Sequence, residues 1–302
     1  MLPSPPNPVH RIAYLGSPAL AVEPLRALVA AGYLVAQVVS RPDKRRGRGS
    51  DVVASPVKAA AQELGLPVTS RIEELLELEI DLGVVVAYGA LIKAPLLAAI
   101  PFVNLHFSLL PRWRGAAPVE RAIMAGDPTT GVCLMALEEA LDVGGVYRRA
   151  ETAVDPSEDL EGLRGRLVGL GTGLLLDALI HGFGPAEPQN GEPTYAAKVQ
   201  PEDRRLNFHQ TPTAVDRIVR LGRAFSTFRG RRLIVHRARP LPEWSAPKDQ
   251  DDVAVGGLVG TVVRCSTGGL ELVEVQPEGR ASQPAAAWRN GNRLEPGEKL
   301  GG

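Results

Sequence analysis

Two hydrophobic periods alternate between residues 11 and 181 of the chain. Short runs rich in apolar residues predict strands, and the continuous apolar run at 81–87 is typical of a strand buried on both faces. Such strands are expected at 11–16, 34–40, 81–87, 102–107, 131–137 and 145–153. Apolar residues at helical spacing predict helices at 20–31, 56–64, 71–79, 118–125 and 157–181. Strands that alternate with helices build parallel sheets, so we expect an α/β domain: a Rossmann-like, mostly parallel sheet with helices on both faces.

A different pattern begins after residue 184. Residues 185–205 contain four prolines and few large apolar side chains, which is typical of a linker. Beyond it, Thr211 followed by Pro212 predicts the start of a short helix that ends near residue 223. Apolar runs then predict strands at 231–239, 258–264 and 270–276. We therefore expect a first domain at 1–184, a linker at 185–205 and a second domain at 206–302, a small OB-like β-barrel.

The composition limits the functions open to this chain. Among its 302 residues, 44% are hydrophobic and 23% are charged, the balance of a globular protein. Cys133 and Cys265 lack metal-ligand spacing and the histidines are scattered, so we expect neither a metal site nor a disulfide framework. The N-terminus does not resemble a signal peptide, and no run approaches the roughly 18 apolar residues of a membrane helix. We expect a cytoplasmic protein.

Charge is distributed unevenly, although the formal net charge is zero. Residues 1–205 hold 20 Lys and Arg against 24 Asp and Glu, a net charge of −4, whereas residues 206–302 hold 14 against 10, a net charge of +4. Two segments concentrate the cations, the loop 41–48 and the arginine-rich stretch 217–239, which has no acidic residue. Arginine suits phosphate, but a solvated basic face is the commoner meaning of such a run.

Three polar side chains stand where an α/β domain usually has its site. Asn104 and His106 are two residues apart on an expected strand, so they project from the same face near its carboxyl end. Asp142 lies in a glycine-rich turn after another expected strand. By the pattern alone, Asn104 and His106 could equally be core residues satisfied by the backbone, and Asp142 a local cap of its turn.

Several motifs together extend this reading. The segments Asn104-Leu-His106-Phe-Ser108-Leu109-Leu110-Pro111 and Leu141-Asp142-Val143-Gly144, with Gly115 between them, resemble the folate-dependent formyltransferases. The run from Ser108 to Pro118 resembles the methionyl-tRNA formyltransferases in particular, as do the runs Arg41–Gly49, Ser55–Lys58 and Val84–Gly89. The resemblance covers about residues 11–200. The chain departs from the family at Val143, where threonine is usual, and at 223–228, where a proline-rich aromatic segment is usual.

The resemblance implies an activity and assigns residues to it. A formyl group would pass from 10-formyltetrahydrofolate to an amine, and Asn104, His106 and Asp142 would be catalytic. Stabilising the negative charge on the formyl oxygen suits the first two, and proton transfer suits the third. The folate would contact Ser108, Leu109, Leu110 and Pro111 and the backbone of Ala87, Tyr88 and Gly89. No metal is implied.

The amine is implied by the second domain, which the methionyl-tRNA formyltransferases use to hold tRNA. Initiator methionyl-tRNA would be the substrate, and the chain would act as a monomer. The loop residues that would enter the tRNA are Arg41, Lys44, Arg45, Arg46 and Arg48. Two alternatives stay open: a formyltransferase acting on a sugar-nucleotide amine, and a degenerate relative that binds folate or RNA without turnover.

Overall fold

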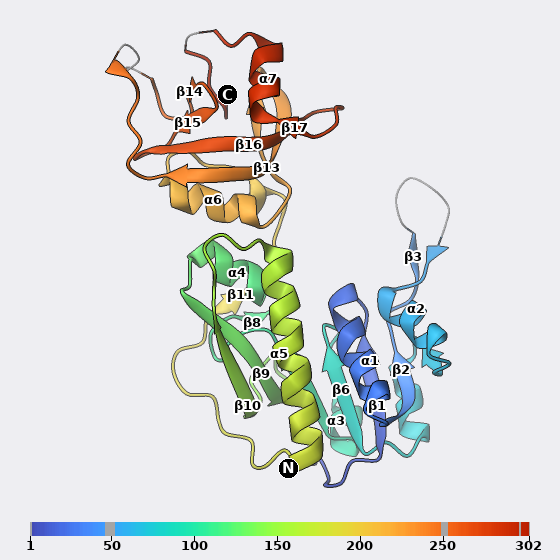
Figure 1. Cartoon of the computed structure of the whole chain (residues 1–302). Helices are drawn as coiled ribbons and strands as arrows, with labels where there is room; N and C mark the ends of the chain where they lie inside the picture. Colours follow the sequence, from blue (N-terminus) through green and yellow to red (C-terminus); the bar gives the residue numbers. More distant parts are fainter. Residues whose placement is uncertain (1, 46–51, 249–252, 296, 302) are drawn as a thin grey trace. The chain divides into compact units, whose positions relative to one another are not determined.

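The computed structural model describes residues 2–45, 52–248, 253–295 and 297–301 (Figure 1). Contacts divide the chain into two compact units. Unit 1 comprises Met1–Val119, Thr129–Ala153 and Glu161–Ala197, and Unit 2 comprises Glu120–Pro128, Val154–Leu160 and Lys198–Gly302. Residues 185–197, which the proline pattern assigns to a linker, therefore pack within Unit 1.

The centre of Unit 1 is a seven-stranded sheet in the order β10-β9-β7-β6-β1-β2-β5. All its neighbouring strands pair in parallel except at β7–β9 and β9–β10, which are antiparallel. The predicted α/β fold with a mostly parallel sheet is confirmed. The strands are β1 Arg11–Gly16, β2 Leu34–Val39, β5 Val68–Thr69, β6 Leu82–Val86, β7 Phe102–His106, β9 Thr129–Ala136 and β10 Val146–Ala153.

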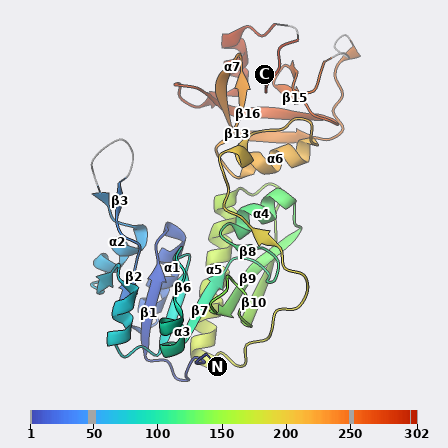
Figure 2. The same ribbon diagram turned by 180° about the vertical axis from the view of Figure 1, so that it is seen from behind.

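Helices cover both faces of this sheet (Figures 1 and 2). They are α1 Val22–Ala30, α2 Pro56–Glu63, α3 Ala94–Ala99 and α5 Leu160–His181, with short 3-10 helices at η1 Ala19–Ala21 and η2 Ile72–Glu77. Most of a further helix, α4 Pro118–Ala125, groups with Unit 2. Gly171 of α5 packs against Leu105 of β7, whereas α3 shares a core cluster with Phe102 of the same strand. Since successive strand residues point to opposite faces, α5 lies on the face opposite to Asn104 and His106.

The long helix α5 begins later than the sequence predicts. Asp155 accepts hydrogen bonds from the backbone nitrogen and the hydroxyl of Ser157, both at 2.7 Å. The nitrogen of Glu158 closes a turn on the Asp155 carbonyl. Residues 155–158 therefore form a separate turn, and α5 starts at Leu160.

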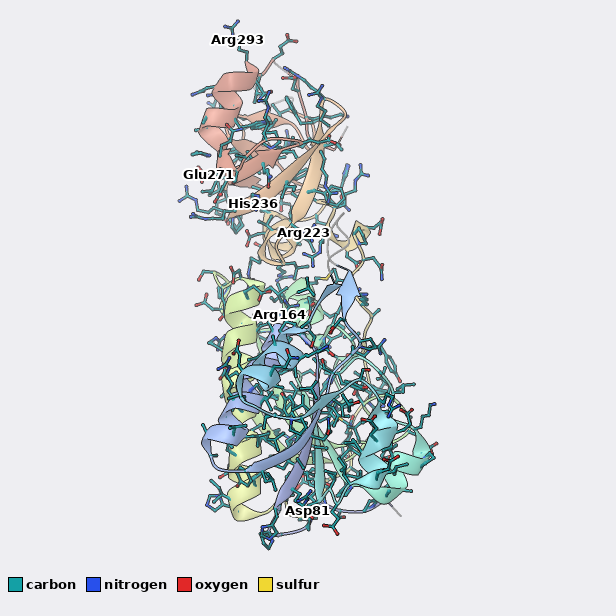
Figure 3. The ribbon with its side chains drawn as sticks, turned by 90° about the vertical axis from the view of Figure 1, so that its right-hand side faces the viewer. Asp81, Arg164, Arg223, His236, Glu271 and Arg293 are labelled. Atoms are coloured by element: carbon teal, nitrogen blue, oxygen red, sulfur yellow. The ribbon has the colours of Figure 1, made fainter. Side chains whose placement is uncertain are left out.

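The start of β1 is fixed by a carboxylate just ahead of β6. Asp81 accepts hydrogen bonds from the backbone nitrogens of His10 and Arg11, both at 2.8 Å (Figure 3). The bond from Arg11 contributes most to holding the pKa of Asp81 below its ordinary value. Two adjacent parallel strands thus start in register, which also aligns their carboxyl ends.

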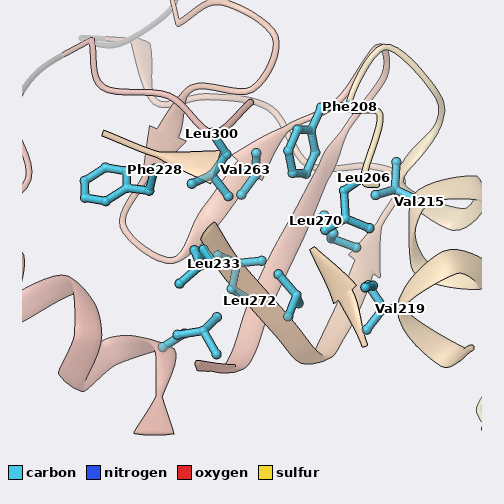
Figure 4. Packing of buried hydrophobic residues seen from close by; sticks show 14 of the residues in the cluster. Leu206, Phe208, Val215, Val219, Phe228, Leu233, Val263, Leu270, Leu272 and Leu300 are labelled. Atoms are coloured by element: carbon cyan, nitrogen blue, oxygen red, sulfur yellow. The ribbon is translucent and has the colours of Figure 1, made fainter. Parts of the chain in front are cut away.

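Unit 2 is rich in strands, as predicted. Its sheet has the order β12-β13-β16-β15-β14, with β17 paired to β16, and every pairing is antiparallel. The strands are β12 Ala224–Phe228, β13 Arg231–Leu241, β14 Leu258–Val259, β15 Val262–Arg264, β16 Gly269–Pro277 and β17 Gln283–Pro284. The helices are α6 Pro212–Arg220, capped by Thr211, and α7 Ala285–Asn292, with a 3-10 turn at η3 Glu202–Arg204. Leucine, valine and aromatic side chains between sheet and helices form its own core (Figure 4).

Candidate active site

The register of β7 places the first two site residues. Val85 of β6 pairs with Asn104, and Cys133 of β9 pairs with His106. The two site residues are therefore flanked by apolar residues of the neighbouring strands. Asn104 is half-buried and His106 is buried, on the face away from α5. Within the described residues, the amide of Asn104 has no hydrogen-bond partner, so its donors and acceptor are available to a ligand.

Both ring nitrogens of His106 face fixed oxygens. Nε2 lies 2.8 Å from the carbonyl oxygen of Trp113, and Nδ1 lies 3.6 Å from Oδ2 of Asp142. Because a carbonyl only accepts, Nε2 carries a proton and donates it to Trp113. Nδ1 faces the carboxylate from just beyond hydrogen-bond distance. The arrangement orients the imidazole.

Asp142 is held in an uncommon backbone conformation. Its φ is +52°, and its Oδ2 accepts a hydrogen bond of 2.8 Å from the nitrogen of Gly115. Two residues on, a side chain on Gly144 would approach the carbonyl oxygen of Ala136 to 2.0 Å, so only glycine fits. Ala87 and Trp113 also have positive φ, at +48° and +62°. Such backbone strain concentrates at functional sites.

The loop after β7 is tied to a segment far along the chain. Strands β8 Arg114–Gly115 and β11 Tyr195–Ala196 pair in parallel. Thr194 accepts a hydrogen bond from the nitrogen of Trp113 at 2.9 Å, and Gln189 accepts two from the guanidinium of Arg114, at 2.7 and 3.0 Å. Sequence reasoning misses Gln189 and Thr194, because a proline-rich stretch carries no period that indicates its contacts.

The predicted folate residues surround the end of β7. The turn Ala87–Gly89 follows β6, the neighbour of β7, so it lies beside the residues after His106. Tyr88 is buried in the core with η2 and α3, and burial raises the pKa of its hydroxyl. Ser108 is buried and donates to the carbonyl of Arg112 at 2.6 Å, and Leu110 packs against Cys133, Met135 and Val146. Leu109 and Pro111 are half-buried.

A cavity of about 610 Å³ lies beside the Asp142 turn. Val143 lines it, together with Arg114, Gln189, Phe102 and Tyr147. The predicted folate residues at 87–89 and 108–111 are not among its walls. At Val143 the cavity therefore meets an apolar side chain, where relatives would present a hydroxyl.

The basic loop, 41–48, begins beside a cluster of serines that lies near the carboxyl ends of β1 and β2. Ser40 lies 2.6 Å from Ser55, which caps α2, and Ser17 accepts from the nitrogen of Arg41 at 3.1 Å. The short strands β3 Lys44–Arg45 and β4 Val52–Val53 pair above this base. Arg46 and Arg48 lie outside the described residues, and for Lys44 and Arg45 the backbone alone is described.

The base of the loop is itself basic. Arg41, Lys58 and Arg71 line a cavity of about 430 Å³ there, and Lys58 pairs with Asp43 at 2.7 Å. The side chain of Arg41 points toward the turn Ala87–Gly89 and donates to the carbonyl of Gly89 at 2.9 Å.

The arginines of 217–239 are largely engaged within Unit 2. Arg239 pairs with Glu271, Arg229 pairs with Glu298 at 2.5 Å, and Arg232 stacks over Phe225 at 3.9 Å. Arg229, Arg231, Arg232 and Arg280 line a cavity of about 950 Å³. This cavity is larger than the one at Val143 but contains none of the predicted catalytic residues.

The described part of the chain offers neither a metal site nor a membrane-spanning helix. No cluster of three or more His, Cys, Asp or Glu side chains in that part of the chain could hold a metal ion. None of its helices is long and apolar enough to cross a membrane.

Comparisons with known proteins identify formyl transferase domains in both parts of the chain. The model of the formyl transferase family matches residues 10–179, and that of the formyl transferase C-terminal domain matches residues 198–293. A methionyl-tRNA formyltransferase of Streptomyces coelicolor is 40% identical, with 96% of this chain and 99% of that protein covered. One from Thermus thermophilus is 41% identical, with the same coverage.

Solved structures share the fold at much lower identity. An N-formyltransferase from Helicobacter canadensis, in complex with folinic acid and dTDP-3-aminofucose, has a TM-score of 0.66 at 14% identity, covering 89% of this chain and 99% of its own. HypX from Aquifex aeolicus, in complex with tetrahydrofolic acid, has a TM-score of 0.59 at 16% identity, covering 94% of this chain and 47% of its own.

Proposed function

The chain belongs to the methionyl-tRNA formyltransferase family of formyl-transferring enzymes, and from that premise we propose the reaction, the residues and the substrates as follows. The formyl group of 10-formyltetrahydrofolate passes to the α-amino group of methionine on initiator methionyl-tRNA. Asn104, His106 and Asp142 carry out the transfer. The observation that supports this most directly is the imidazole of His106, held between the Trp113 carbonyl and the Asp142 carboxylate.

The reaction needs a stabilised oxyanion and a path for one proton. The neutral amine attacks the formyl carbon, the carbonyl electrons move to oxygen, and collapse breaks the bond to N10 of the folate. The amide of Asn104 donates to the oxyanion. His106 reaches it through Nε2–H, so the formyl oxygen takes the place of the Trp113 carbonyl as acceptor. The amine proton leaves through Asp142 or a water beside it, and N10 gains a proton on release.

The folate binds at the carboxyl ends of β6 and β7. Its pterin ring meets backbone groups of the turn Ala87–Gly89, and the remainder runs along Ser108, Leu109, Leu110 and Pro111. Two observations support this assignment. The turn and the loop are adjacent through the pairing of Val85 with Asn104. The chain also belongs to a formyltransferase family.

The tRNA reaches the enzyme through the basic loop and the second unit. Arg41, Lys44, Arg45, Arg46 and Arg48 contact the tRNA backbone, and the arginines around the Unit 2 cavity supply further positive charge. The activity belongs in the cytoplasm, where translation starts, and the chain works as a monomer. Sedimentation at micromolar concentration checks the last point, and a dimer contradicts it.

A formyltransferase for sugar-nucleotide amines is the second candidate, because the Helicobacter canadensis neighbour carries such a ligand. At 14% identity that neighbour supports the fold alone, whereas the methionyl-tRNA enzymes are about 40% identical over nearly the whole chain.

One assay tests the choice. Formyl transfer from 10-formyltetrahydrofolate is measured with methionyl initiator tRNA, with the same tRNA uncharged, and with a dTDP-amino sugar. We expect product with the charged tRNA alone. Turnover of the amino sugar, with none of the charged tRNA, rejects the proposal.

A further inference from the structure

The side chain of Gln189 binds the backbone of the turn that carries the proposed catalytic Asp142. Its amide nitrogen donates two hydrogen bonds, to the carbonyl oxygens of Asp142 and Gly144, both at 2.8 Å. Its amide oxygen accepts two more from the guanidinium of Arg114. Both protons of the amide nitrogen and both lone pairs of its oxygen are therefore in use. Gln189 is half-buried in an exposed stretch, between the exposed Pro188 and Asn190.

The two peptides that Gln189 holds set the direction of the carboxylate. Asp142 has a φ of +52°, a conformation that L residues leave readily when nothing fixes it. Its carbonyl is one of the two that Gln189 binds, and the Gly144 carbonyl on the other side of Val143 is the second. Rotation of the Asp142 backbone would swing Oδ2 away from Nδ1 of His106, which lies only 3.6 Å away.

The other end of Gln189 is anchored in the loop that completes the same site. Arg114 precedes Gly115, whose nitrogen donates to Asp142 at 2.8 Å, and follows Trp113, whose carbonyl accepts from His106. Gln189 thus links the turn that carries Asp142 to the loop that contacts both Asp142 and His106. The pairing of β8 with β11 and the bond from Trp113 to Thr194 bring the segment close enough to do so.

We propose that Gln189 is a positioning residue for formyl transfer, which sets the distance between the Asp142 carboxylate and the His106 ring through hydrogen bonds at both ends of its amide. It acts through the backbone of Asp142 and through Arg114. The inference rests on the proposed catalytic role of Asp142. Two substitutions distinguish hydrogen-bond donation from packing. In Gln189→Met the side chain fills nearly the same volume but has no donors. In Gln189→Glu the side chain keeps the contact with Arg114 but likewise has no donors.

The test compares Gln189→Met and Gln189→Glu with Asp142→Asn and with Gln37→Met. Gln37 is a half-buried glutamine of β2 in the same unit. Among the described residues its side chain bonds only to the adjacent Val38 carbonyl, so it controls for the substitution itself. For each variant, kcat, KM for 10-formyltetrahydrofolate and Tm are measured with methionyl-tRNA. A misplaced reacting group costs on the order of 100-fold in rate, so we expect kcat to fall about 10- to 100-fold in both Gln189 variants.

The pattern across the variants distinguishes positioning from stability. We expect the two Gln189 variants to lose kcat equally while KM for the folate changes less than about twofold, although Gln189→Glu keeps the higher Tm through Arg114. Two outcomes overturn the inference and leave the role of Asp142 intact. In the first, kcat falls in proportion to Tm across the variants. In the second, the kcat of Gln189→Met is within twofold of wild type while Asp142→Asn is inactive. An active Asp142→Asn enzyme overturns both. If Gln189→Met does not fold, Gln189→Glu alone decides, because its ion pair preserves the contact with the loop.

Discussion

Arg41 donates a hydrogen bond of 2.9 Å to the carbonyl oxygen of Gly89, so the base of the basic loop is joined to the turn proposed to hold the pterin ring. The contact is exposed, and an exposed charge-assisted bond contributes about 1 kcal/mol. We expect Arg41→Ala to weaken both tRNA and folate binding, the latter about two- to fivefold.

Arg71→Ala is the matched control for Arg41. Arg71 lines the same cavity but bonds to Glu74 and not to the turn. Isothermal titration with a tetrahydrofolate, without tRNA, checks the expectation. Equal folate affinity in Arg41→Ala and wild type removes the link.

The loop beyond Arg41 should act on tRNA alone. Replacing Lys44, Arg45 and Arg46 by Ala removes three cations but leaves the Arg41 contact to Gly89 in place. If all three touch phosphate, the slope of log affinity against log salt flattens by about 2–3, and folate binding is unchanged. tRNA affinity at several salt concentrations tests this; parallel lines of equal affinity exclude the loop from recognition and favour the sugar-amine alternative.

The three proposed catalytic residues should behave as one unit. His106→Ala is expected to lower turnover by about a hundred- to ten-thousand-fold, with folding and tRNA binding retained. Asn104→Ala and Asp142→Ala should each lose a similar factor, and the losses should not multiply in the double variants. Single-turnover kinetics measures the chemical step directly. Near-normal turnover in His106→Ala contradicts the assignment.

The sheet should bind a folate and not a nicotinamide dinucleotide. The first turn reads Gly16-Ser17-Pro18, which lacks the glycine spacing that binds a pyrophosphate. Gly16 also packs against the carbonyl of Val86 and the side chain of Ala21, each 3.0 Å from an added Cβ. A tetrahydrofolate at a hundred times its Kd should stabilise the chain by about 2.7 kcal/mol, and NAD by none. Thermal shifts with both ligands decide; stabilisation by NAD alone would falsify the folate assignment.

Asp216 should make Unit 2 less stable as the pH rises. Burial raises the pKa of its carboxyl from 3.8 to about 6, with Arg220 opposing the shift. The unfolded chain therefore loses this proton at a lower pH than the folded chain, so the free energy of unfolding falls between about pH 4 and pH 6. Asp216→Asn should raise it by on the order of 1–3 kcal/mol above pH 6 and change it little near pH 4.

Asp203 provides the control of opposite sign. A hydrogen bond from the nitrogen of Gln200, then one from Arg121, lower the pKa of Asp203 despite some burial. Its contribution is present above the ordinary value and is lost as the pH falls, so Asp203→Asn should destabilise the chain at neutral pH only. Urea unfolding of both variants at pH 4 and pH 7 tests the pair. Identical pH dependence in the two variants contradicts the argument.

The sequence predicts the sheet well because most of its strands and helices have a recognisable pattern of apolar residues within a short stretch of sequence. Apolar runs mark β1, β2, β6 and β7, and Asn104 and His106 follow from the two-residue period of β7. The pattern misses β12, where small residues such as Ala224 and Ser226 occupy the buried positions. It also misplaces the start of α5, because Asp155 binds Ser157 in a separate turn.

The hydrogen bonds that hold the site could not be predicted, because they join segments far apart in the sequence. The bond from Trp113 to Thr194 spans 81 residues, and the bonds from Arg114 to Gln189 span 75. No short window of sequence contains both partners. The resemblance to formyltransferases identifies Asp142, but only the fold identifies what holds it.

The pairing of β8 with β11 has a consequence for the order in which the chain becomes functional during its synthesis. Gln189 follows Asp142 by 47 residues, which at about 5–20 residues per second leaves the ribosome roughly 2–9 s later. During that interval the nascent chain can build the central strands, and Gly115 can bind the Asp142 carboxylate, but Gln189 does not yet hold the carbonyls of Asp142 and Gly144. The proposed activity therefore depends on a late segment that has almost no secondary structure of its own. A chain released before residue 197 would contain the proposed catalytic residues but not the segment that aligns them.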